Sequence, residues 1–154
     1  MVVDFIIVLA FGCVYVICIS ISSALGVHSI EDIRQKKITA VITLIFSIIG
    51  ILLQVWNGDH SVVQILSGMA LGVCIMGFSY LTKGKIGIGD GMILVMTGIY
   101  LGIVDNLRLL CISFFLAGIW GILLLVLGFD KQTKIPFVPF LFFGELLMVI
   151  GGMG

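Results

Sequence analysis

Two aspartates have the residue type and the setting for paired acid and base chemistry. Asp32 follows a long uncharged stretch, and Asp90 ends the tetrapeptide Gly87-Ile88-Gly89-Asp90. Two carboxyl groups that share a partly dehydrated site do not both ionise easily, so one keeps its proton while the other is charged. Such a pair supplies a general acid and a general base together.

Each aspartate also has an ordinary structural explanation. Asp is a favoured N-cap residue, so Asp90 is suited to capping the helix that follows it. Asp32 lies just before three basic residues, which are Arg34, Lys36 and Lys37. A solvated ion pair is the usual role of a surface carboxylate in such a setting. A GxGD tetrapeptide by itself is too weak a signal to decide between these explanations and catalysis.

Other polar residues have weaker claims to chemistry. Glu145 falls near the middle of the last apolar run, and we interpret it as a protonated glutamate that is hydrogen-bonded between helices. His28 and His60 are interpreted as ordinary interfacial histidines. The four cysteines form no CxxC pair and none adjoins a histidine, so we expect packed small residues and no zinc site or disulfide framework. They are Cys13, Cys18, Cys74 and Cys111.

The composition of the chain indicates whether these residues lie in a soluble protein or in a membrane protein. The chain has 154 residues, of which 61% are hydrophobic and 10% charged, and its mean hydropathy is +1.35. Soluble domains are about half apolar and about one quarter charged, so the composition predicts a membrane protein. Its formal net charge of zero argues against nucleic-acid binding.

Uncharged runs predict an all-α membrane bundle of about six transmembrane helices, forming a single domain over residues 1–154. We expect the first helix to be retained, because it has no small-residue cleavage site. The six runs are Phe5–Leu25, Ile38–Asn57, Ser61–Thr82, Gly91–Val104, Leu109–Phe129 and Ile135–Gly154, the last interrupted by Glu145. Glycines at GxxxG spacing, Gly68/Gly72 and Gly98/Gly102, favour close packing within the bundle over dimerisation.

Basic residues predict the orientation of these helices. Seven of the eight lie in the first, third and fifth loops, which places those loops in the cytoplasm and both termini outside. Asp32 and Asp90 then lie on the same membrane face. The fourth run spans only about 21 Å, against a hydrocarbon core of about 30 Å, so Asp90 is expected below the cytoplasmic interface.

Three segments together resemble the type IV prepilin peptidases, which are membrane-embedded aspartyl proteases. GIGDGMIL at Gly87–Leu94 is similar to their GxGD signature, and EDIRQKKI at Glu31–Ile38 resembles their first aspartate motif. IPFVPF at Ile135–Phe140 resembles their IPFGPF segment. The order of the motifs, the 58-residue separation of the aspartates and the expected six spans all match this family.

The resemblance implies a role for each matching residue. Asp32 and Asp90 correspond to the two catalytic aspartates, and Gly87 and Gly89 to glycines that let the backbone bend and approach substrate. In the third segment, possible contributors to the substrate site are Pro136, Phe137 and Pro139. The chain departs from the family at Thr39-Ala40, which replaces Pro-Asn or Pro-Asp, at Gly91-Met92-Ile93, where a lysine is common, and at Val138, which replaces glycine.

The same resemblance implies the reaction and its partners. It predicts an endopeptidase in the cytoplasmic membrane that needs no cofactor and removes short basic leaders from prepilins or pseudopilins, with its active site facing the cytoplasm. Either aspartate can be the acid or the base, because a coupled pair titrates as a unit. The interval Gly26–Lys37 is too short for the methyltransferase region of longer members.

Other functions remain open at this point. One is a small proton-coupled transporter or channel subunit in which Asp32, Asp90 and Glu145 form a relay, and another is a noncatalytic assembly subunit. An archaeal preflagellin peptidase is a close variant of the first hypothesis. A presenilin-type protease is disfavoured because its first aspartate lies inside a helix, whereas Asp32 is expected in a loop.

Overall fold

The structure is a computed structural model that describes residues 2–35, 39–57, 61–82, 87–128 and 136–152. Within these ranges the chain forms five α-helices and no strands. They are α1 (Val2–Gln35), α2 (Ala40–Asn57), α3 (Val62–Leu81), α4 (Ile88–Val126) and α5 (Val138–Ile150). This confirms the predicted all-α bundle, but the predicted count of six helices is wrong.

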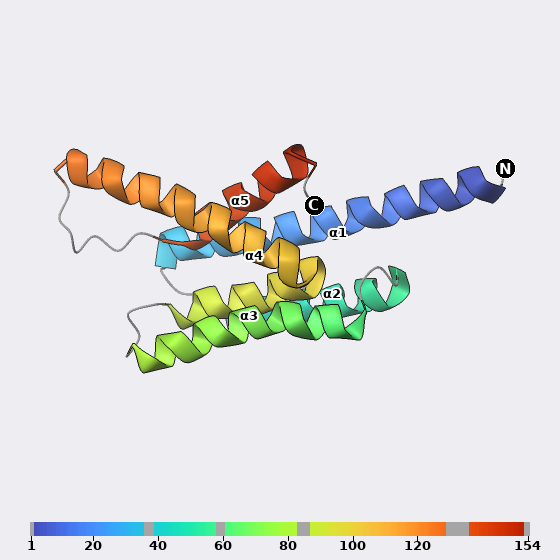
Figure 1. The fold of residues 1–154 in the computed structure, drawn as a ribbon, viewed down its shortest axis with the longest axis horizontal. Helices are drawn as coiled ribbons and strands as arrows, with labels where there is room; N and C mark the ends of the chain where they lie inside the picture. The colour runs from blue at the N-terminus through green and yellow to red at the C-terminus, as the bar shows by residue number, and fades with distance from the viewer. Residues whose placement is uncertain (1, 36–38, 58–60, 83–86, 129–135, 153–154) are drawn as a thin grey trace.

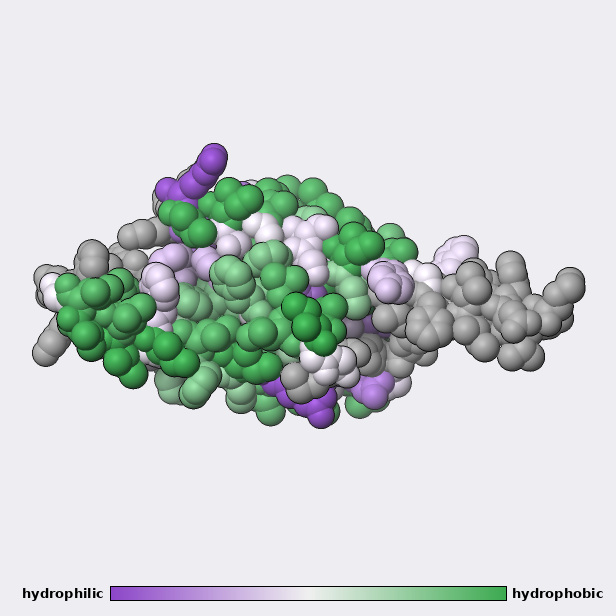
Figure 2. Space-filling model, turned by 90° about the horizontal axis from the view of Figure 1, so that it is seen from above, coloured by the Kyte–Doolittle hydropathy of each residue, from purple (hydrophilic) through white to green (hydrophobic). Residues whose placement is uncertain are grey.

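Three of these helices are long and apolar enough to cross a membrane, which makes the chain a membrane protein. They contain the stretches Tyr15–Arg34, Val62–Leu81 and Ile88–Val126. Much of the outer surface is apolar, and Figure 2 shows green side chains over most of the face seen from above. Cys74 and Cys111 are exposed on this surface, so the expectation that they are packed inside is wrong.

The count differs because α4 contains two of the predicted helices. Its 39 residues would span about 58 Å if straight, about twice the hydrocarbon thickness. Gly102 instead has φ 68° and ψ −173°, a conformation that favours glycine, and the helix breaks there. Figure 1 shows the limbs on either side of this break, residues 88–101 and 103–126, running in opposite directions. One glycine therefore replaces the expected loop.

Asn106 holds this reversal in place. Its Nδ2 atom donates hydrogen bonds to the carbonyl oxygens of Leu94 at 2.9 Å and Gly68 at 3.2 Å. Thr97 Oγ1 donates to Asn106 Oδ1 at 2.7 Å. Residues 94 and 106 would lie about 18 Å apart along a straight helix, so these bonds require the chain to fold back. The Asn106 side-chain amide, the Thr97 hydroxyl and the two carbonyl groups therefore all have hydrogen-bond partners.

The GxxxG glycines bring α3 against the first limb of α4. A Cβ atom added at Gly68 would overlap the backbone of Gly98 and Gly102, and one added at Gly72 would overlap the backbone of Gly91 and Val95. The predicted internal packing of these glycines is confirmed. The close contact fixes the first limb of α4, and therefore Asp90 in its first turn, against α3.

Helix α1 continues beyond the predicted end of the first span. The residues from Gly26 to Gln35 extend the same helix, and the sequence SIEDIRQKK was expected to be a loop. Its buried face includes Ile21, Leu25, His28 and Asp32, which recur at helical spacing. Asp32 therefore lies in the last turn of a membrane helix.

Candidate active site

Asp32 projects from the end of α1 toward the beginning of α5. Only 8% of the residue is exposed, and the backbone amide of Val138 donates a hydrogen bond to Asp32 Oδ2 at 3.1 Å. This contact differs from the solvated ion pair considered above. Arg34 is exposed, while Lys36 and Lys37 lie outside the described residues.

Asp90 occupies the third residue of α4 and is not its N-cap. The N-cap is Gly87, whose backbone amide donates a hydrogen bond to the Asp90 carboxylate. A Cβ atom at position 87 would lie 2.8 Å from Asp90 Oδ2. Gly87 has an ordinary φ of −65°, so glycine serves here to leave room for the carboxylate and not to permit an unusual bend.

The fold brings the two aspartates into one site. Asp32 comes from the last turn of α1 and Asp90 from the first turn of α4, and their charges are close enough to repel each other. Two carboxyl groups in this relation favour a state in which one of them holds a proton. The site can thus take a proton from a water molecule and donate another to a bound group.

The described part of the segment that resembles IPFGPF, residues 136–140, contacts Asp32 through Val138. Phe137 is the N-cap of α5, and its ring packs against Phe114 of α4 with centroids 5.1 Å apart. Pro136 and Pro139 are half-buried beside it. Val138, which stands where the family has glycine, is fully buried and supplies the amide that binds Asp32.

Glu145 lies away from the paired aspartates. It is 3% exposed, and Ser22 Oγ donates to both of its carboxyl oxygens at 2.8 and 3.0 Å. The predicted hydrogen bond between helices is therefore confirmed. Ser22 precedes Asp32 by ten residues, about 15 Å along α1, so the contacts described for Glu145 provide no relay to the aspartates.

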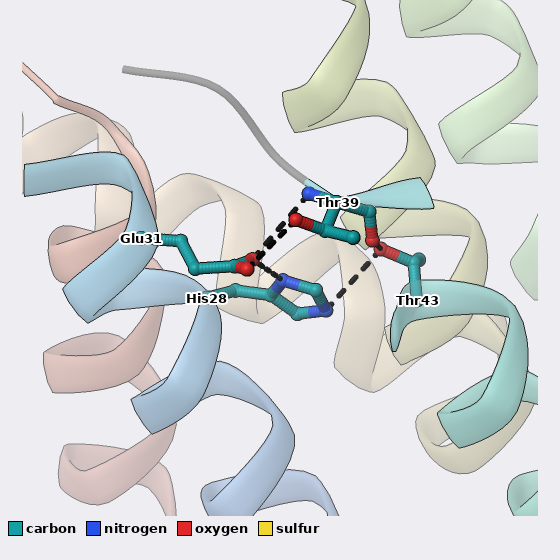
Figure 3. Close-up of polar contacts among 4 residues, drawn as sticks. All are labelled: His28, Glu31, Thr39 and Thr43. Carbon is teal, nitrogen blue, oxygen red and sulfur yellow. Dashed lines mark hydrogen bonds and ion pairs between the residues drawn. The ribbon is translucent and has the colours of Figure 1, made fainter. Parts of the chain in front are cut away.

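His28 is not the interfacial histidine that was expected. It is fully buried, and its ring lies between Glu31 on α1 and Thr43 on α2 (Figure 3). Glu31 in turn accepts a hydrogen bond from the Thr39 hydroxyl. Sequence patterns indicate no role for Glu31 or Thr43. The four-residue spacing of His28 and Asp32 is the signal that places this histidine on the same helix face as the aspartate.

Metal ligation has no candidate among the residues that the structure describes. Within these ranges, no group of three or more His, Cys, Asp or Glu side chains is arranged to hold an ion. His60 lies outside the described residues, as does the side chain of Cys13. Cys18, Cys74 and Cys111 have free thiols.

Comparison with known protein families matches residues 18–122 to the type IV leader peptidase family. That range is more than half of the chain. The chain belongs to the type IV leader peptidase family. Comparisons with curated proteins and with solved structures gave no match.

Membership of the leader peptidase family indicates that the protein is a peptidase. The matched range contains both Asp32 and Asp90. The match ends before the segment at residues 135–140, whose place in the site comes from its contact with Asp32. One argument from the sequence is wrong. Asp32 lies inside a helix, so its position does not distinguish this leader peptidase from a presenilin-type protease.

Proposed function

We propose that this leader peptidase is a membrane-embedded aspartyl endopeptidase that removes the short basic leader from type IV prepilins or pilin-like precursors at the cytoplasmic membrane face. The proposal is supported by the burial of Asp32, by the position of Asp90 in the first turn of α4, and by a separation of the two carboxyl groups small enough for their charges to interact. A third helix terminus, the beginning of α5, contributes the Val138 amide, which donates a hydrogen bond to Asp32.

The reaction uses the two carboxyl groups in different protonation states. The charged carboxylate takes a proton from water, and the water oxygen forms a bond to the scissile carbonyl carbon. The protonated carboxyl group donates its proton to the carbonyl oxygen. When the C–N bond breaks, the leaving amine takes a proton from the first carboxyl group, and a hydroxyl group of the tetrahedral intermediate returns a proton to the second as the C=O bond re-forms. The pair therefore finishes with one proton and is ready for another cycle.

Recognition of the leader by charge is unfavourable in this chain. The loops predicted to face the cytoplasm are basic and would repel a basic leader. Affinity is better supplied by the apolar helix that follows the leader, packing against membrane helices beside the site, together with backbone hydrogen bonds near the cleavage point. Pro136, Phe137 and Pro139 are our candidates for these contacts.

The decisive experiment is a cleavage assay with purified protein. The full chain in detergent or liposomes is mixed with a prepilin that carries a basic leader ending in glycine, and the products are weighed by mass spectrometry. We expect a single cut at the leader boundary. A doubly substituted Asp32→Asn/Asp90→Asn protein, prepared in parallel, excludes a contaminating protease. Absence of cleavage by the unsubstituted protein, tested with both bacterial prepilins and archaeal preflagellins, contradicts the proposal.

A further inference from the structure

The cluster formed by His28, Glu31, Thr39 and Thr43 joins the end of α1 to the beginning of α2 (Figure 3). Thr39 Oγ1 donates to Glu31 Oε1 at 2.8 Å, and the Thr39 amide donates to Glu31 Oε2 at 3.4 Å. The Thr39 carbonyl accepts hydrogen bonds from the amides of Ile42 and Thr43 in the first turn of α2, at 3.1 and 3.2 Å. Glu31 thus provides negative charge at the N-terminus of α2, where the helix dipole favours it.

His28 adds a second connection between the same two helices. Its Nδ1 atom lies 3.2 Å from Glu31 Oε2, and its Nε2 atom lies 3.2 Å from Thr43 Oγ1. Because the ring is fully buried, both nitrogens need these partners. The last turn of α1 is therefore tied to the first turn of α2 by Glu31 and His28 together.

These contacts control the rotation of α1 at the place where Asp32 projects. Glu31 immediately precedes Asp32, and His28 lies one helical turn before it on the same face. Any rotation of the last turn of α1 that displaces Glu31 from Thr39 also turns the Asp32 carboxyl group. The Val138 amide holds Asp32 from α5, so this turn is held from two helices.

The oxygen atoms of Glu31 are used by these contacts. One accepts the Thr39 hydroxyl, and the other faces the Thr39 amide and the His28 ring. Glu31 is therefore suited to holding a neighbour in place and not to exchanging protons with a substrate.

We propose that Glu31, held by His28 and Thr39, is a positioning residue that aligns the Asp32 carboxyl group with Asp90 for catalysis. The proposal rests on the peptidase function proposed above. It predicts that loss of the cluster lowers the rate of the chemical step, while the binding of substrate is unchanged.

Thr39 offers the cleanest test because two substitutions separate its hydroxyl from its methyl group. Thr39→Val keeps the shape and removes the donor, and we expect kcat for leader cleavage to fall about 10- to 100-fold with KM little changed, as small misplacements of catalytic groups can cost this much. Thr39→Ser keeps the donor, and we expect its kcat to stay within about twofold of the unsubstituted protein.

A double-mutant cycle tests whether Glu31 and Thr39 act through one contact. Glu31→Ala is expected to reduce kcat at least as much as Thr39→Val, and the two changes together no more than Glu31→Ala alone. Ser23→Ala is the control on α1, because the Ser23 hydroxyl is exposed and donates to the Ile19 carbonyl of its own helix. Its kcat should be unchanged. Thermal unfolding in detergent is measured for every variant.

Several results would overturn the positioning role. One is a Thr39→Val protein that cleaves at the normal rate, and another is equal loss in Thr39→Val and Thr39→Ser, which would show that the hydroxyl donor does not account for the effect. Additive losses in the cycle would also contradict it. If Thr39→Val does not fold, Glu31→Ala takes its place, because it removes both acceptor oxygens, and normal kcat in that variant overturns the proposal. Failure of the unsubstituted protein to cleave any leader contradicts instead the peptidase function.

Discussion

The backbone amide of Val138 lies 3.1 Å from Asp32 Oδ2 and donates a hydrogen bond to it, although the two residues are 106 positions apart. The bond places a buried carboxyl group at the N-terminus of α5, where free amides and the helix dipole stabilise negative charge. Through it, the segment at residues 136–140 becomes part of the site that contains Asp32 and Asp90.

Single substitutions of the paired aspartates test the catalytic assignment. We expect Asp32→Asn and Asp90→Asn each to abolish leader cleavage, because an amide cannot share a proton as a carboxyl group does. Asp105→Asn is the matched control: Asp105 forms a 2.7 Å ion pair with the exposed Arg108 and lies at the start of the second limb of α4, just after the break at Gly102. Activity and membrane insertion are measured for all three variants. Full cleavage by either Asp32→Asn or Asp90→Asn would eliminate the aspartyl mechanism.

Two glycines of α3 provide a paired test of the packing against α4. Gly68→Ala is expected to lower the free energy of unfolding by about 1–3 kcal/mol, because the new methyl group meets the backbone of Gly98 and Gly102. Gly77→Ala, on the same helix, has no atom within 4 Å of the added Cβ and should not destabilise the protein. Unfolding in detergent gives both values, and equal stability of the two variants would contradict the close packing.

Substitution of Asn106 tests the reversal within α4. Asn106→Leu removes one hydrogen-bond partner each from the Thr97 hydroxyl and from the buried carbonyl groups of Leu94 and Gly68. We expect a loss of at least about 2 kcal/mol, because buried polar groups without partners carry a desolvation cost. The midpoint of thermal unfolding reports the change. A variant as stable as the unsubstituted protein would show that Gly102 alone maintains the turn.

Accessible-thiol labelling tests the predicted orientation in the membrane. In a background without the four native cysteines, single cysteines at Lys36, Lys83 and Lys131 should be shielded from an impermeant thiol reagent added outside intact cells. A cysteine at Asp59 should react. The reason is that basic loops are retained in the cytoplasm. The reverse labelling pattern would place the aspartate site on the outer face.

We also predict cleavage without methylation of the new N-terminus. The chain between the first two predicted spans, residues 26–37, has no room for a folded methyl-donor domain, and α1 itself occupies this interval through Gln35. Incubation with a prepilin and S-adenosylmethionine should give a mature pilin without an added methyl mass. Cleavage should persist in a metal chelator, since the two carboxyl groups need only water. A methylated product refutes the first expectation, and loss of cleavage on chelation points to a metalloenzyme.

The interpretation of Asp90 depended on both sequence and structure. The GxGD motif located the residue and its helix, but charge and spacing alone also allowed an N-cap. Only the structure shows that Gly87 is the N-cap. It also places Asp90, the third residue of α4, near Asp32. Capping is a local property, whereas this meeting depends on how α1 and α4 pack.

By itself, the sequence determined that this is an all-α membrane protein, which residues are apolar enough to span the bilayer, and which two aspartates to compare with a known family. Those properties depend on composition and short motifs, which are local features of the sequence and do not require the rest of the fold. Tertiary structure decided that α4 reverses at Gly102, that Asp32 lies inside a helix, and that the Val138 amide binds its carboxyl group. These outcomes depend on backbone contacts and hydrogen bonds between separate helices. Hydropathy does not encode such contacts, because a loop and a helical extension of the same polarity look alike along the chain.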